Sequence, residues 1–275
     1  MRPSQVHLSA ASGAPVLVKV ILLQPLLMAQ LWGAEALLPG NHSAAPATPC
    51  ARDSQPWQVS LFHGLKFQCA GVLVDPSWVL TAAHCWRKKT LMARVGNDHQ
   101  LFFLEKQLRL THPPVIHPKY QPCSGPILPH RSDEHDIMLL KLKSPVVMNS
   151  RVYPLQLPYQ CAQPGQACHS AGWGTTATRR VKYNTKLTCS RVTLLSSKQC
   201  EVFYPGVITN NMICAGLDNG QDPCQSDSGG PLVCDEILQG ILSWGIYPCG
   251  ASQHPAVYTE ICKYVPWIRK VIHSN

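Results

Sequence analysis

The hydrophobic positions of this 275-residue chain fall mainly in short runs rich in β-branched and aromatic residues. Turn-forming clusters separate the runs, and this spacing predicts an all-β barrel or sandwich rather than alternating strands and helices. Near the end, apolar residues from Tyr264 to Ile272 recur at helical spacing, which predicts a short amphipathic C-terminal helix. The expected strands are Trp57–Phe62, Phe67–Val74, Trp78–Leu80, Ile137–Leu142, Thr188–Leu195, Gly240–Trp244 and Ala256–Ile261.

Residues 1–36 have the pattern of a secretory signal peptide. Lys19 and Gln24-Pro25 interrupt the apolar stretch Val16–Leu31, so it falls short of the roughly 20 residues that span a bilayer. Ala34-Glu35-Ala36 then matches a cleavage signature. A membrane anchor or a buried helix is the competing interpretation of this stretch.

Residues 37–49 are rich in Pro, Ala and small polar residues, and we interpret them as a pro-segment or linker. They contain one glycosylation sequon at Asn41. Residues 50–275 then form the main domain, long enough to bury a sizeable core.

The composition favours a folded protein of an oxidising compartment. Hydrophobic residues make up 45% of the chain and charged residues 14%, which excludes a solvated disordered tail. None of the 13 cysteines forms a Cys-x-x-Cys pair, so a disulfide framework is favoured over a zinc finger or a redox motif. We therefore expect a secreted, extracellular protein.

Three segments place a reactive side chain among small or apolar neighbours. They contain His84 in Thr81–Cys85, Asp136 in Asp136–Leu140, and Ser228 in Asp227–Pro231. Each alone is typical of a structural histidine, a capping acid or a plain loop. Together they match a need of serine catalysis, because a serine hydroxyl requires a neutral imidazole to take its proton and a buried carboxylate to orient that imidazole.

With these segments the chain resembles the chymotrypsin-fold serine proteases, and in particular the tissue kallikreins. The resemblance runs from about Cys50 to Asn275. It implies two six-stranded antiparallel β-barrels with a short C-terminal helix, and an active site in the cleft between the barrels. Further motifs that carry it are Ser54–Leu61, Gly172–Gly174, Tyr204–Gly206, Asn211–Gly216 and Ser243–Gly245.

The resemblance assigns a role to each site residue. Ser228 is the expected nucleophile, His84 the general acid and base, and Asp136 the orienting carboxylate. The backbone N–H groups of Ser226 and Ser228 are the expected oxyanion hole. Ser243, Trp244 and Gly245 are expected to pair with the substrate backbone as an added strand.

Asp222 matches the base of the primary specificity pocket in trypsin-like members. It implies a preference for Arg or Lys at the cleaved bond; the alternative is a solvated acid in a turn. Ala256 stands where such proteases have a pocket-wall glycine, so its methyl group is expected to narrow the pocket.

The family pairing implies six disulfide bonds. It leaves Cys123 over, as a free or capped thiol or as one half of an intermolecular bridge. The implied pairs are Cys50–Cys189, Cys69–Cys85, Cys161–Cys262, Cys168–Cys234, Cys200–Cys214 and Cys224–Cys249.

Zymogen activation is where the chain departs most from the family. Members are cut after Lys or Arg, which frees an apolar, Gly-rich terminus whose amine pairs with the Asp before the nucleophile. That partner, Asp227, is present, but Ala44–Ala47 occupies the place of the terminus and no Lys or Arg lies between Lys19 and Arg52. Ser226 also replaces the usual glycine of the oxyanion loop, where other residues fit less readily.

The sequence therefore leaves two hypotheses. The first is a secreted kallikrein-like serine endopeptidase that is weakly active, acts as a monomer on protein or peptide substrates, and is inhibited by serpin-type proteins. The second is a catalytically silent secreted interaction protein on the same fold. The retained His84, Asp136 and Ser228 favour the first.

Other partners have weaker support. The formal net charge is +9, and the basic runs Arg87–Lys89 and Arg179–Lys186 either bind polyanions or are solvated surface. His112, His117, His130 and His135 either gather a zinc ion, as in some kallikreins, or are scattered. We expect no cofactor, no resident metal, and neither nucleic acid nor a membrane as partner.

Overall fold

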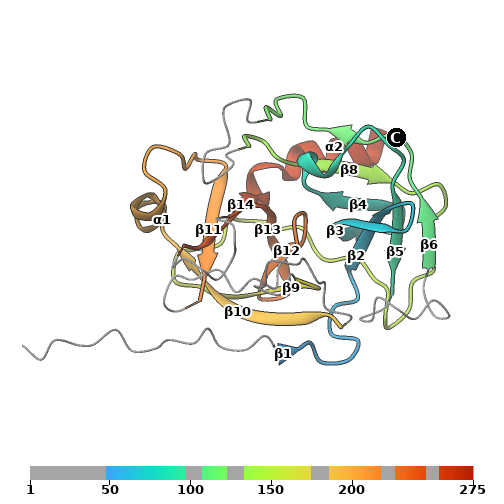
Figure 1. Ribbon diagram of the computed structural model, residues 1–275, viewed down its shortest axis with the longest axis horizontal. Coiled ribbons are helices and arrows are strands. Elements are labelled where there is room, and N and C mark those ends of the chain that lie inside the picture. Colours follow the sequence, from blue (N-terminus) through green and yellow to red (C-terminus); the bar gives the residue numbers. More distant parts are fainter. Residues whose placement is uncertain are drawn as a thin grey trace, which may run out of the picture. The chain divides into compact units, whose positions relative to one another are not determined.

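The computed structural model describes residues 48–96, 107–122, 133–174, 186–217, 227–245 and 254–274. The chain divides into residues 1–42 and 43–275, and every described residue belongs to the second unit. The described residues form two antiparallel sheets, and Figure 1 draws one mainly in blue and green and the other mainly in yellow to red. The predicted all-β fold is thereby confirmed.

The first sheet has seven strands in the order β6-β5-β2-β3-β4-β8-β7. It curls until its two ends approach each other, where Thr111 and Leu142 form a single bridge. Its strands are β2 (Gln58–His63), β3 (Lys66–Asp75), β4 (Trp78–Thr81), β5 (Met92–Val95), β6 (Gln107–Leu110), β7 (Val115–Ile116) and β8 (Met138–Lys141).

The second sheet closes into a six-stranded barrel, because β9 pairs with both β12 and β10. The strand β1 (Thr48–Pro49) is added to β10 outside the closed ring. The barrel strands are β9 (Ala167–Gly172), β10 (Thr188–Leu195), β11 (Met212–Gly216), β12 (Pro231–Cys234), β13 (Ile237–Trp244) and β14 (Ala256–Glu260). The structure thus has one closed barrel and a curled sheet in the place of the second.

Helices occupy three places in the described chain. The 3-10 turn η1 (Ala83–Cys85) follows β4, and η2 (Ile261–Lys263) leads into the predicted C-terminal helix, α2 (Val265–Ser274). Ile268 and Val271 are the buried face of α2, in agreement with the helical spacing. The helix α1 (Ser197–Phe203) starts at a capping box between Ser196 and Gln199, each side chain satisfying a backbone N–H of the other.

Five disulfide bonds join described residues, and each joins two cysteines that the family resemblance pairs. They are Cys50–Cys189, Cys69–Cys85, Cys161–Cys262, Cys168–Cys234 and Cys200–Cys214. The expected pair Cys224–Cys249 and the unpaired Cys123 lie outside the described residues. Among the described helices, none has the length and apolar character needed to cross a bilayer.

Candidate active site

The pairing of β4 with β8 brings His84 beside Asp136. Thr81 pairs with Met138, so the turn that follows β4 and the segment that precedes β8 leave the sheet at the same end. His84 lies in that turn, η1, and Asp136 lies two residues before β8. Two residues that are 52 positions apart in the sequence thus meet through the register of one strand pair.

Asp136 is completely buried and hydrogen-bonded on both carboxylate oxygens. Oδ1 accepts from the backbone N–H of His84 at 2.9 Å, and Oδ2 lies 2.7 Å from His84 Nδ1. Oδ2 also accepts from the Ser243 hydroxyl at 2.5 Å. Burial alone raises the pKa of Asp136, but the charge and hydrogen bonds of His84, with the bond from Ser243, outweigh it and lower the pKa below its usual range. The carboxylate is therefore ionised and fixes the imidazole.

The backbone around Ser228 is locked between the two sheets. Ser228 O accepts from the N–H of Ala70 in β3 at 2.9 Å, and the N–H of Gly229 donates to Leu242 in β13 at 2.8 Å. Gly229 has a φ of 80°, in the left-handed region that favours glycine. These contacts place the residue at the junction of the curled sheet and the barrel.

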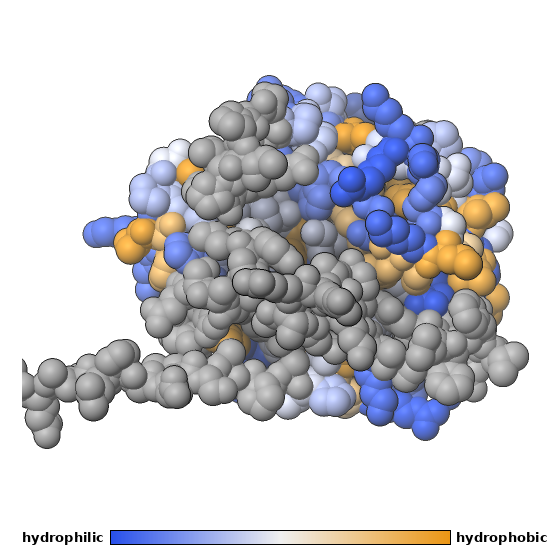
Figure 2. All heavy atoms as spheres, viewed as in Figure 1, coloured by the Kyte–Doolittle hydropathy of each residue, from blue (hydrophilic) through white to orange (hydrophobic). Residues whose placement is uncertain are grey.

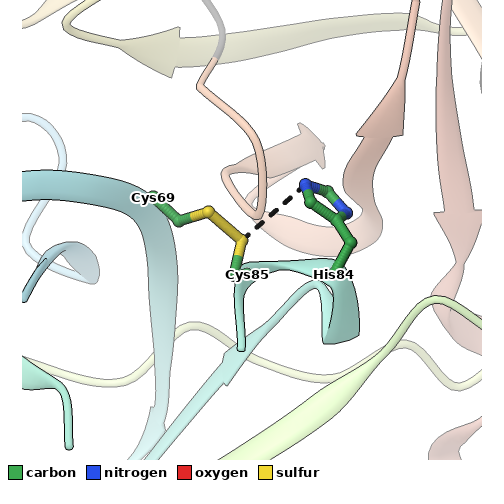
Figure 3. A group of neighbouring side chains, drawn as sticks. All are labelled: Cys69, His84 and Cys85. Atoms are coloured by element: carbon green, nitrogen blue, oxygen red, sulfur yellow. Dashed lines mark hydrogen bonds between the residues drawn. A yellow bond between two sulfur atoms is a disulfide. The ribbon is translucent and has the colours of Figure 1, made fainter. Parts of the chain in front are cut away.

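The imidazole of His84 does not hydrogen-bond to Ser228, although the structure describes both residues. Its Nε2 atom lies 3.9 Å from Sγ of Cys85, and Figure 3 shows this nitrogen directed at the Cys69–Cys85 disulfide. Catalytic hydrogen bonds are often loose in the absence of substrate, so this geometry is compatible with a triad that tightens on binding.

The expected activation partner, Asp227, is buried with 6% of its surface exposed. Its Oδ2 atom accepts from the backbone N–H of Trp173 at 2.6 Å, and no cation among the described residues forms an ion pair with it. Burial raises its pKa to about 7, against the hydrogen bonds from the backbone of Trp173 and Gly174, which lower it.

The other expected substrate-binding residues lie on neighbouring barrel strands. Ser243 and Trp244 end β13, and Ala256 begins β14 and is fully buried. Trp244 packs edge-on against Tyr204, with ring centroids 4.9 Å apart. Ser226, Asp222 and Asn41 lie outside the described residues.

The sequence did not reveal two of the residues that donate hydrogen bonds to Asp136. Ser243 was assigned to substrate binding alone, yet its hydroxyl donates to the Asp136 carboxylate. Thr259 was not singled out, and its hydroxyl donates to the backbone carbonyl of Asp136 at 2.9 Å. No local pattern signals either contact, because the partners are more than 100 residues away in the chain.

Clusters with metal-ligand chemistry are few in the part of the chain that the structure describes. Two of the three groups of close His, Cys, Asp or Glu residues contain disulfide cysteines, which have no thiolate to offer. The third is His84, Asp133 and Asp136, which overlaps the hydrogen-bonded pair of His84 and Asp136. Of the four histidines considered for zinc, His117 and His135 stack on each other, His112 is exposed, and His130 lies outside the described residues.

This geometry agrees with the comparisons with known proteins. The family model described as Trypsin matches residues 46–268. The chain belongs to the trypsin family of serine proteases. Within that family it is 70% identical to human Kallikrein-10 over 280 aligned positions, covering the whole of both sequences. It is therefore a kallikrein homologue.

Solved structures of trypsin-family proteases also superpose on this chain. The structure named Kallikrein-related peptidase 10 superposes with a TM-score of 0.69 at 66% identity, over 83% of this chain and 100% of that one. The structure of neuropsin, a serine protease expressed in the limbic system of mouse brain, superposes with a TM-score of 0.75 at 44% identity, over 82% of this chain and 98% of that one.

Proposed function

We propose that this trypsin-family protein is a secreted, weakly active serine endopeptidase that cleaves peptide bonds after Arg or Lys. The observation that carries the proposal is the buried, ionised Asp136, which contacts both the backbone and the ring of His84. A carboxylate that receives a charge-assisted hydrogen bond from the imidazole orients the ring and stabilises it when it becomes positive.

The proposed reaction is acyl transfer in two steps. His84 removes the hydroxyl proton as Ser228 Oγ attacks the substrate carbonyl, and the proton then passes to the leaving amine. The N–H groups of Ser226 and Ser228 stabilise the oxyanion. Water, activated by His84, hydrolyses the acyl-enzyme and restores the Ser228 hydroxyl.

The Arg or Lys preference rests on Asp222 in the sequence. A carboxylate at the base of a pocket favours a cationic side chain, and the buried Ala256 is expected to limit the room for it. Ser243, Trp244 and Gly245 are proposed to align the substrate as an extended strand, since Ser243 and Trp244 end β13 beyond Ile241, where its pairing with β12 stops.

Low activity follows from the surroundings of Asp227. A buried carboxyl group without a cationic partner is costly to ionise. No cation among the described residues pairs with Asp227, so within that part of the chain the loop that leads to Ser228 has no ion pair to fix it. The same observation, with the loose placement of the His84 ring, favours the alternative of a catalytically silent interaction protein.

We propose a domain order of signal peptide 1–36, pro-segment 37–49 and protease domain 50–275, with a glycan on Asn41. The five disulfides support an extracellular location. We propose that the protein acts as a monomer and that serpin-type inhibitors are partners.

Polyanions are a further proposed partner. Figure 2 shows hydrophilic side chains gathered over the region where Figure 1 draws the β2–β3 hairpin and the chain that enters β5. Arg87, Lys88 and Lys89 are exposed in that chain. Clustered cations attract polyanions, and salt weakens this attraction.

A fluorophosphonate probe tests the function directly, because it labels only an activated serine. The secreted protein is treated before and after limited proteolysis, beside Ser228→Ala and a control, Ser190→Ala, in β10. Labelling of wild type and control but not of Ser228→Ala is expected, after cleavage upstream of Thr48. Absence of labelling from every cleaved form would favour the silent alternative.

A further inference from the structure

The segment Asp133–Asp136 is anchored at every side chain. It precedes β8 of the curled sheet, yet two of its anchors come from much later in the chain: Asn211, next to the barrel strand β11, and Tyr264, which follows β14 and η2. Asp136 itself contacts His84 and Ser243. The remaining contacts are Asp133 with the hydroxyl of Tyr120 at 3.2 Å, Glu134 with Nδ2 of Asn211 at 2.5 Å, and His135 with the hydroxyl of Tyr264 at 2.9 Å.

His135 holds the tight turn that delivers Asp136. Its φ of 53° lies in the left-handed region, which residues other than glycine seldom adopt. Its carbonyl accepts from the N–H of Ile137 at 2.8 Å, so the turn closes around Asp136. Such a backbone persists only where its surroundings hold it. The side-chain contacts of His135 are therefore candidates for what holds this turn.

The phenol of Tyr264 keeps its proton in these surroundings. Burial, helped by the charges of Glu134, Asp136 and Glu260, raises the pKa of Tyr264 well above its ordinary value, so the phenol keeps its proton. The hydroxyl of Tyr264 can therefore donate to Nδ1 of His135. The other ring nitrogen, Nε2, faces Oε1 of Glu134 at 3.7 Å. This arrangement gives both ring nitrogens a polar neighbour.

A second histidine covers the ring of His135. His117 stacks on it with centroids 5.0 Å apart and an interplanar angle of 19°. Tyr264 and Trp267 meet His117 edge-on. Burial, followed by the charges of His135 and Lys119, lowers the pKa of His117, so this ring packs in its neutral form at neutral pH. The His135 ring is thus held by a stacked face and a hydrogen bond.

We propose that His135 is a positioning residue for the catalytic carboxylate: Tyr264 and His117 fix its ring, and the fixed ring aims Asp136 at His84. Tyr264 follows β14 and η2 in the chain and packs into the hydrophobic core of the curled sheet, so the same contact ties the segment before β8 to the chain that leaves the barrel. The proposal rests on the proposed function for the catalytic use of Asp136.

Tyr264→Phe tests the proposal, because it removes one hydroxyl and keeps the ring packing. The matched control is Tyr153→Phe, the same change at an exposed tyrosine that packs on Trp57. The first measurement is the far-downfield proton NMR resonance of His84 Nδ1–H in its bond to Asp136, which requires no catalysis. We expect it in wild type and Tyr153→Phe, and expect it broadened or shifted upfield in Tyr264→Phe.

The second measurement is the concentration dependence of fluorophosphonate labelling. In Tyr264→Phe the maximal labelling rate is expected to fall about fivefold, as for the loss of an ordinary hydrogen bond, while the half-saturating probe concentration stays unchanged. An unaltered resonance with wild-type labelling in Tyr264→Phe would overturn the proposal. If no form labels at all, the proposed function fails, and the resonance alone decides the role of His135.

The variant His135→Asn distinguishes the contribution of the imidazole ring from that of the backbone turn. It also serves as the test if Tyr264→Phe does not fold. Asparagine tolerates the left-handed region, so this variant keeps the turn and loses the stacked ring. The positioning role predicts the same altered resonance as in Tyr264→Phe. A resonance like that of wild type would show that only the turn matters and would contradict the proposal.

Discussion

Asp227 couples the protonation of one buried carboxyl group to the stability of the fold. Its folded pKa is about 7, whereas an unfolded aspartate titrates near 3.8. Between these values the folded state binds more protons than the unfolded state, so the free energy of unfolding falls as pH rises. The full difference is on the order of 4 kcal/mol, which is lost by the time the pH exceeds the folded pKa.

We therefore expect Asp227→Asn to flatten the pH dependence of stability. Melting temperatures of wild type and variant, measured from pH 4 to pH 8, should differ increasingly in favour of the variant as the pH rises. Taking the difference removes the contributions of other titrating groups, such as His117, His169 and Glu260. Parallel curves would mean that another cation already pairs with Asp227.

At the scale of single residues, the sequence predicts the reactive side chains more readily than the residues that support them. His84, Asp136 and Ser228 stand out because each sits in a segment of unusual local composition. Thr259 and Tyr264 do not, because their contribution depends on partners brought near only by the fold. A hydroxyl that donates to a distant carbonyl leaves no local pattern in the chain.

Among the elements, the β12–β13 hairpin contains a turn whose second residue is unfavourable. Cys234 pairs with Ile237, so the loop has two residues, Asp235 and Glu236, with φ of 50° and 59°. Both are left-handed, which is the turn that Asn-Gly or Asp-Gly suits best. We expect Glu236→Gly to stabilise the protein by about 1 kcal/mol, because it removes backbone strain.

Chemical denaturation of Glu236→Gly measures this gain. The comparison variant is Arg191→Gly, at an exposed position within β10. The same substitution in regular strand backbone is expected to destabilise by about 0.5–1 kcal/mol. A loss of stability in Glu236→Gly would show that the glutamate side chain, not the backbone, determines this turn.

Element prediction succeeded where β-branched and aromatic residues dominate, as in β2, β3 and β10. It did not predict β1, β5, β6, β7, β9, β11 or β12. Of these, β9 has the sequence Ala-Cys-His-Ser-Ala-Gly, which lacks β-branched and aromatic residues. That strand is determined by its pairing with β10 and β12 rather than by propensity. The helix α1 is short and without a clear apolar period, although the Ser196–Gln199 capping box was a readable start signal.

In the molecule as a whole, the two sheets meet without room for an added atom at Gly229. A Cβ there would overlap the Thr81 hydroxyl and lie 2.5 Å from the carbonyl oxygen of Ala70. We expect Gly229→Ala to lower the melting temperature sharply or to prevent secretion, since both a left-handed backbone and the sheet junction are disturbed. The control is Gly64→Ala, which is also left-handed but has no atom within 4 Å of the added carbon.

The Gly64→Ala variant is expected to lose only about 1 kcal/mol, from backbone strain alone. Equal losses in the two variants would show that the junction yields easily. The sequence could not anticipate this junction or the way in which the barrel of β9–β14 closes. Closure depends on whether β9 reaches β10 across the barrel, which is a long-range property of the folded chain.

The attachment of β1 to β10 has a consequence for any processing of the leader. Thr48 pairs with Cys189, and Cys50 is covalently joined to the same residue. An amine created by a cut upstream of Thr48 therefore remains tethered to the barrel, and if Asp227 is its partner, as we propose, their encounter is independent of dilution. A short flexible tether corresponds to a local concentration on the order of millimolar, which a free peptide supplied in trans would have to match.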